Sequence, residues 1–135
     1  MSQSGFEEIQ HTADWALRIW APDLPELFRQ AGLGMNALMG LDLEKRPTRP
    51  VSMVLAAEDV ESLLVEFLNE VVYYLEIEQT GFSDYSIRLD GAALVAELDG
   101  CRVRGLEKPI KAVTFHNLAI ETIGNGVEAR LVFDV

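Results

Sequence analysis

The residues best suited to chemistry stand near the two ends of the sequence. His11 and Asp14 are three residues apart, and a histidine and a carboxylate at this spacing could bind a divalent cation or exchange a proton. At the other end, Asp134 precedes Val135, whose terminal carboxylate would be a second anion. Adjacent anions need a cation or a basic side chain nearby, and oxygen ligands suit calcium, magnesium or manganese. The ordinary alternatives are a turn at residues 11–14 and a solvated chain end.

Two further segments carry polar side chains beside apolar runs. Lys111 stands between Ile110 and Ala112 at the start of a predicted strand, where its ammonium could reach a phosphate or a carboxylate. A lysine that only protects a sheet edge is the alternative. Asn69 and Glu70 lie off the apolar stripe of a predicted helix, so they indicate either a solvated face or an acidic contact surface.

The composition restricts the classes of partner. There are 22 aspartates and glutamates against 11 lysines and arginines, which gives a formal net charge of −11. Binding to nucleic acid through its phosphates depends on basic side chains, so we expect little direct binding to nucleic acid. A cation or a basic protein is a better match. Cys101 is the single cysteine and excludes an internal disulfide.

The length and the distribution of apolar residues predict one compact unit. A chain of 135 residues with 49% hydrophobic residues fits a single domain over residues 1–135. The apolar runs are too short for a membrane span, and the acidic N-terminus lacks the basic and apolar order of a signal peptide. We therefore expect no membrane association and a cytoplasmic location.

Two helices are predicted to support the polar segments. Residues 23–39 should form a helix capped by Asp23 and ended by Gly40, in which Gly32 and Gly34 mark a close approach to another element. This helix follows residues that favour two short strands or one bent strand.

The second helix pattern is the stronger one. It covers residues 58–78, with apolar side chains at the spacing of one helical face, and is expected to end at Gly81. Residues 41–50 contain two prolines and mixed charges and predict a loop, which a strand at residues 51–57 follows.

The C-terminal half predicts antiparallel strands. Alternation of apolar and polar residues over residues 83–105 indicates a meander, and two more strands are expected at residues 110–123 and 127–135. The expected fold class is therefore α+β, a largely antiparallel sheet with two main helices packed on it.

The turn between the last two strands predicts a register. Asn125–Gly126 is a strong signal for a two-residue hairpin loop. That loop would place Asn117 opposite Asp134 and His116 opposite the last residue, with Lys111 on the same face as Asp134.

Taken together, these motifs resemble the archease family. The segments that carry the resemblance are HTAD at residues 11–14, DLPELF at residues 23–28, LLVEFLNE at residues 63–70, IKAVTFH at residues 110–116 and FDV at residues 133–135. The chain departs from the family at Phe115, where tyrosine is frequent, and at Ala16, where glycine is frequent. The resemblance covers almost the whole chain and implies an α+β domain.

The resemblance also implies a divalent-metal site. Asp14 and Asp134 would supply side-chain ligands, Val135 would contribute its backbone or terminal carboxylate, and Lys111 would be a functional basic residue close by. The expected cation is calcium, with magnesium or manganese as alternatives. His11 and His116 are expected to contact the ligand side chains rather than the metal itself.

Archeases assist RtcB-type RNA ligases in tRNA splicing and RNA repair. The resemblance therefore implies a protein that is not an enzyme but promotes guanylylation of the ligase, so that the ligase turns over repeatedly. A second interpretation is a chaperone-like modulator of a tRNA-modifying methyltransferase that binds through an acidic surface including Glu66 and Glu70. A third is a metal-dependent hydrolase built from His11, Asp14, His116 and Asp134.

Overall fold

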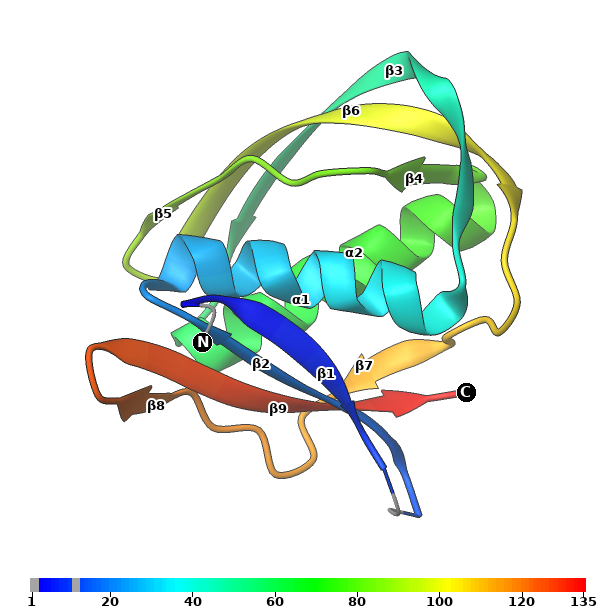
Figure 1. The fold of residues 1–135 in the computed structure, drawn as a ribbon. Coiled ribbons are helices and arrows are strands. Elements are labelled where there is room, and N and C mark those ends of the chain that lie inside the picture. The colour runs from blue at the N-terminus through cyan, green and yellow to red at the C-terminus, as the bar shows by residue number, and fades with distance from the viewer. Residues whose placement is uncertain (1–2, 11–12) are drawn as a thin grey trace.

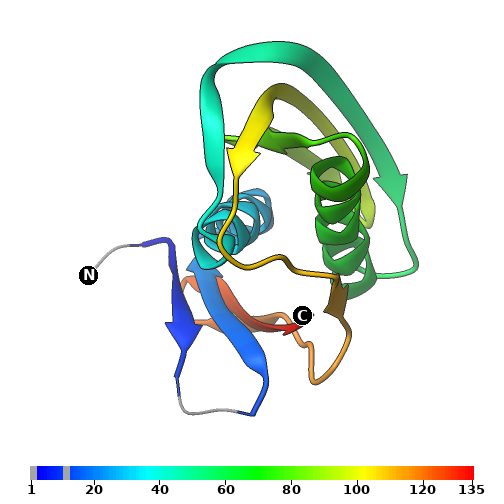
Figure 2. The ribbon, with the colours of Figure 1, turned by 90° about the vertical axis from the view of Figure 1, so that its right-hand side faces the viewer.

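Two α-helices lie between two antiparallel β-sheets, as Figure 1 and Figure 2 show from perpendicular directions. The computed structural model describes residues 3–10 and 13–135. The helices are α1 (Leu24–Met39) and α2 (Val60–Ile77). The first sheet contains β1 (Gly5–Ile9), β2 (Trp15–Ala21), β7 (Ala112–Thr114), β8 (Glu121–Ile123) and β9 (Gly126–Asp134). The second sheet contains β3 (Asp42–Ala56), β4 (Thr80–Phe82), β5 (Ile87–Asp90) and β6 (Ala93–Gly105).

The strand order places β9 and β6 at the centres of the two sheets. The first sheet has the order β1-β2-β9-β7, with β8 also paired to β9, and the second has the order β3-β6-β4, with β5 also paired to β6. The α+β class, the two helices and the antiparallel strands are confirmed. The strands are divided between two sheets, so each helix contacts a sheet on either side.

Helix α1 has the ends that its sequence predicts. The Asp23 side chain accepts a hydrogen bond from the backbone N–H of Glu26 at 3.0 Å, and Gly40 ends the helix in the left-handed conformation with a φ of 60°. Gly32 is needed for packing, because a Cβ atom there would lie 2.5 Å from the ring of Tyr85. The predicted close approach is confirmed at this position.

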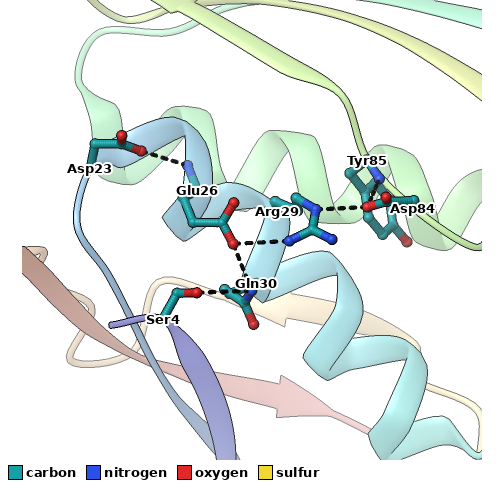
Figure 3. A network of polar contacts seen from close by, with 7 residues as sticks. All are labelled: Ser4, Asp23, Glu26, Arg29, Gln30, Asp84 and Tyr85. Carbon is teal, nitrogen blue, oxygen red and sulfur yellow. Dashed lines mark hydrogen bonds and ion pairs between the residues drawn. The ribbon is translucent and has the colours of Figure 1, made fainter. Parts of the chain in front are cut away.

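A polar network ties α1 to the segments around it (Figure 3). The carboxylate of Glu26 accepts hydrogen bonds from Arg29 at 3.0 Å and from Gln30 at 2.7 Å. Arg29 also donates to Asp84, on the segment between β4 and β5, at 2.7 Å. The network therefore joins the first turns of α1 to the second sheet.

The predicted loop at residues 41–50 is wrong, because most of that segment belongs to β3. This strand pairs only with β6, so it is an edge of the second sheet, and its register shifts three times between Asp42 and Arg49. An edge strand with irregular pairing tolerates Pro47 and Pro50, since a proline without an N–H can face solvent there.

Helix α2 is shorter than the predicted residues 58–78, because it begins at Val60 and ends at Ile77. Asp59 caps its N-terminus through the backbone N–H of Ser62 at 2.7 Å, and Glu78 is its C-cap residue. Gly81 does not end the helix but lies inside β4, where a Cβ atom would meet Leu43 at 2.7 Å. The buried faces of both helices and both sheets form one hydrophobic cluster.

The C-terminal strands follow a different register from the predicted one. Ile123 pairs with Gly126, so the turn residues are Gly124 and Asn125, and Gly124 has a φ of 55°. The predicted strand at residues 110–123 is divided into β7 and β8, because residues 115–120 leave the ladder.

This register changes the neighbours of Asp134. Ala112 pairs with Asp134 in place of Asn117, so Ala112 and not Lys111 shares the face of Asp134. His116 lies beyond the end of β7 and is not opposite the last residue. The two corrections follow from the loop at residues 115–120 and from the turn, which lies one position earlier than predicted.

Candidate functional site

Two aspartates meet at one edge of the first sheet. Trp15 pairs with Phe133 in the ladder between β2 and β9. Asp14 directly precedes Trp15, and Asp134 directly follows Phe133, so the two aspartates extend this ladder by one position. Both are exposed. Residues 120 positions apart in the sequence thus become neighbours.

Lys111 joins the same edge from the other side of β9. Its backbone N–H donates a hydrogen bond to the backbone carbonyl of Asp134 at 2.8 Å, and its side chain is exposed. We call Asp14, Lys111 and Asp134 the charged edge. The structure therefore gathers three of the predicted site residues at neighbouring ends of the adjacent strands β2, β9 and β7.

A second lysine, Lys108, which carries no motif in the sequence, lies near the charged edge. The ammonium of Lys108 is 4.2 Å from the ring centroid of Trp15, and that ring packs edge to face against Phe133 at 6.2 Å. The backbone N–H groups of Glu107 and Lys108 both donate to the carbonyl of Met39, at 2.8 and 3.1 Å. The position of the Lys108 ammonium is therefore determined by its contact with Trp15, which is distant in the sequence and which no motif indicates.

Asn69 is a further residue whose role the sequence did not indicate. Its side-chain oxygen accepts from the backbone N–H of Val113 at 2.8 Å, and its amide nitrogen donates to the Val113 carbonyl at 3.2 Å. Asn69 is half-buried rather than part of a solvated face. It holds β7, the strand that Lys111 precedes, against α2.

Three further candidates, His116, Glu66 and Glu70, do not belong to the charged edge. His11 lies outside the described residues. His116 is exposed in the segment after β7, with its ring nitrogen 3.2 Å from the side-chain nitrogen of Asn117. Glu66 is exposed and Glu70 is half-buried, both on α2.

The donor set at the charged edge suits a hard cation but is incomplete. Asp14 and Asp134 would supply carboxylate oxygens, and Val135 would add a backbone or terminal carboxylate oxygen next to them. Calcium takes 6–8 oxygen ligands. Within residues 3–10 and 13–135, no three or more His, Cys, Asp or Glu side chains are grouped so that they could hold a metal ion. Further oxygens would have to come from backbone, water or a bound partner.

Three further observations concern the helices, the single cysteine and the exposure of the charged edge. None of the described helices is both long and apolar enough to cross a membrane. Cys101 is buried in β6, as its strand pattern predicts. The charged edge itself is open to solvent, which suits contact with another molecule better than enclosure of a small substrate.

Comparison with known proteins places the chain in one family. The model of the Archease protein family (MTH1598/TM1083) matches residues 6–135. The archease of Methanosarcina mazei is 29% identical over 143 residues, which cover 96% of this chain and 95% of that protein. The archease of Archaeoglobus fulgidus is 31% identical over 136 residues, with coverage of 94% and 96%.

Solved structures agree with the sequence comparison. The crystal structure of an archease and possible chaperone from Thermotoga maritima superposes with a TM-score of 0.72, at 25% identity and 96% coverage of both chains. The solution structure of a Methanobacterium thermoautotrophicum protein gives a TM-score of 0.75, at 30% identity and coverage of 97% and 99%. Sequence and fold lead to the same conclusion: this chain belongs to the archease family.

Proposed function

We propose that this protein activates an RtcB-type RNA ligase and performs no catalysis of its own. The observation that carries the proposal is the charged edge, where the β2, β9 and β7 strands bring Asp14, Asp134 and Lys111 together. An open edge of this kind can enter the nucleotide site of another protein. There it would help to position a triphosphate for guanylylation of the ligase.

The side chains of the charged edge have different tasks in this proposal. Asp14 and Asp134, with the backbone of Val135, would hold a divalent cation, calcium first and magnesium or manganese as alternatives. When bound, such a cation supplies positive charge that polarises phosphoryl oxygens. Lys111, whose backbone N–H donates to the Asp134 carbonyl, would bring its ammonium to the same edge and oppose the negative charge that develops on phosphate.

A turnover experiment tests the activator function. Limiting ligase from the same source is given excess broken RNA and GTP, with and without this protein. We expect a change from about one ligation per ligase to many, and a loss of that change with Asp134→Ala and Lys111→Ala. Asp99→Ala, at an exposed position of β6, is the matched control and should activate normally. Full activation by both edge variants would refute the proposed role of the edge.

A second candidate function has its own support. The relative from Thermotoga maritima is described as a possible chaperone, and α2 presents Glu66 on its exposed face, with Glu70 half-buried nearby. A chaperone-like modulator of a tRNA methyltransferase would bind through this acidic surface. A salt-sensitive pull-down of the methyltransferase that Asp14→Ala leaves unchanged would favour it, and so would a ligase that shows no change in turnover despite a normal first ligation.

A further inference from the structure

A hollow beside α2 combines an exposed aromatic ring with carboxylates. Its volume is about 560 Å³, and its lining residues are Ala56, Ala57, Glu58, Ser62, Glu66 and Phe115. Phe115 is 58% exposed, more than any other aromatic side chain in residues 3–10 and 13–135. Exposure of a large apolar ring costs free energy of solvation, so its position needs a reason.

The loop after β7 is built to hold this ring over α2. Leu118 donates its backbone N–H to the Phe115 carbonyl at 3.0 Å, and Asn117 between them has a φ of 54°. Ile120 then donates to the carboxylate of Glu61 on α2 at 3.3 Å. The same segment that breaks the predicted register thus fixes Phe115 at the rim of the hollow.

The carboxylates of the hollow lack counter-charges. Glu58 and Glu66 are exposed, and neither forms an ion pair with a basic side chain of the described residues. By contrast, the arginines at positions 18, 29, 49 and 104 are all paired with acidic side chains. The hollow therefore offers unneutralised negative charge next to an aromatic face.

We propose that this hollow receives an arginine side chain of a protein partner. A guanidinium is planar and weakly hydrated, so it can stack on the Phe115 ring while its N–H groups bind the Glu66 and Glu58 carboxylates. The small side chains of Ala56 and Ala57 leave room for the stem. The net charge of −11 favours the approach of a basic surface.

The position of the hollow makes it an anchor for the same partner as the charged edge. Lys111 precedes β7 and Phe115 follows it, so about 13 Å of extended chain separates them at roughly 3.3 Å per residue. One partner surface can span that distance. The assignment of the arginine to the ligase rests on the proposed function. The binding of an arginine in the hollow does not depend on that function.

A peptide titration tests the hollow without the ligase. The ¹⁵N-labelled protein is titrated with a blocked tetra-arginine peptide and with the neutral tetra-citrulline peptide, and amide chemical shifts are followed. We expect tetra-arginine alone to shift amides around Phe115, Glu66 and Ala57. Phe115→Leu keeps an apolar side chain without the aromatic face and should weaken binding by about two- to fivefold. Glu66→Gln should weaken it as well, and Glu97→Gln on the second sheet should not.

Two results of the titration would overturn the inference. One is a set of shifts spread evenly over the acidic surface, and the other is binding that Phe115→Leu and Glu66→Gln leave unchanged. Both variants alter exposed side chains, and a dispersed spectrum identical to wild type away from the hollow verifies their fold.

The ligase assay then assigns the partner. Phe115→Leu and Glu66→Gln should raise the concentration of this protein that gives half-maximal activation and leave the maximal turnover unchanged. Lys111→Ala should instead lower the maximal turnover. If wild-type protein fails to activate the ligase, the proposed function fails while the peptide titration still decides the inference. If activation occurs and the hollow variants match wild type at every concentration, the arginine does not belong to the ligase.

Discussion

The side chain of Asn69 on α2 forms two hydrogen bonds with the backbone of Val113 on β7. It accepts one from the Val113 N–H at 2.8 Å and donates one to the Val113 carbonyl at 3.2 Å. On its other side, Val113 pairs with Phe133 of β9. Asn69 therefore supplies the donor and the acceptor that a further strand would otherwise provide. Because Lys111 directly precedes β7, the helix fixes the distance between Lys111 and the core of the sheet.

Replacement of Asn69 by leucine should destabilise the fold. Asn69→Leu leaves the N–H and the carbonyl of the buried Val113 without partners, at a cost of roughly 1–3 kcal/mol in the free energy of unfolding. Urea denaturation measures this as a lower midpoint at an unchanged slope. Glu76→Leu places the same side chain at an exposed position of α2 and should change stability by no more than about 0.5 kcal/mol. Equal stability of the two variants would contradict this role.

Local signals predicted the helices well because their ends are determined locally. Asp23, Asp59 and Gly40 act through hydrogen bonds and backbone angles within one turn, so the sequence contains the whole cause. The segment at residues 41–50 differs, since its prolines are compatible with a strand only where that strand forms an edge. Position in a sheet is a tertiary property that the local composition does not specify.

The glycines of the last hairpin show how one residue type can have two causes. The sequence pattern predicts Gly126 as a turn residue, but a Cβ atom at this position would lie 2.5 Å from the backbone oxygen of Ala21 on β2. Gly124 is the residue with the left-handed angle. The motifs in the sequence predict only part of the charged edge and its surroundings. They contain Asp14, Lys111 and Asp134, whereas Lys108 and Asn69 act through contacts between elements that are distant in the sequence.

Replacement of Gly32 by alanine tests the close packing of α1 against Tyr85. A Cβ atom there would lie 2.5 Å from the ring, so Gly32→Ala forces the ring or the helix to move. We expect a loss of roughly 1–3 kcal/mol in the free energy of unfolding, although alanine favours a helix. Gly105→Ala, where a Cβ atom meets nothing within 4 Å, should leave the thermal midpoint nearly unchanged. A stabilised Gly32→Ala variant would show that the helix and the ring are not in contact.

The ion pair between Arg29 and Asp84 should make part of the stability depend on pH. The hydrogen bond from Arg29 lowers the pKa of the Asp84 carboxyl in the folded protein. A lowered pKa stabilises the fold above the unfolded pKa, about 3.9, and this contribution disappears as the pH falls through the folded value.

Asp84→Asn should therefore reduce the free energy of unfolding at pH 7 by no more than about 1 kcal/mol, because the pair is largely exposed. The difference from wild type should shrink towards zero as the pH falls through the lowered pKa of Asp84. Denaturation at several pH values, with Arg29→Gln and the double variant, measures the coupling. A difference that grows on acidification would contradict the assigned sign.

Calcium should stabilise the protein through the two aspartates of the charged edge. A ligand that binds only the folded state adds about 2.7 kcal/mol at a concentration one hundred times its Kd, which raises the thermal midpoint by several degrees. Asp14→Asn and Asp134→Asn should each remove the increase, and a chelator should remove it from wild type. Asp99→Asn on β6 should respond like wild type. If both edge variants keep the full response, calcium binds elsewhere.

Paired cysteines can test the register that forms the charged edge. Ala112 and Asp134 are partners in the ladder between β7 and β9, at the separation of Cα atoms that a disulfide requires. In a Cys101→Ala background, Ala112→Cys with Asp134→Cys should oxidise to an internal disulfide, seen as a loss of two hydrogens by mass spectrometry. Asn117→Cys with Asp134→Cys, the pair that a turn at Asn125 and Gly126 would align, should stay reduced. The opposite result would restore the ladder without the loop at residues 115–120, and Lys111 would then share the outer face of Asp134, which would change how the edge meets a phosphate.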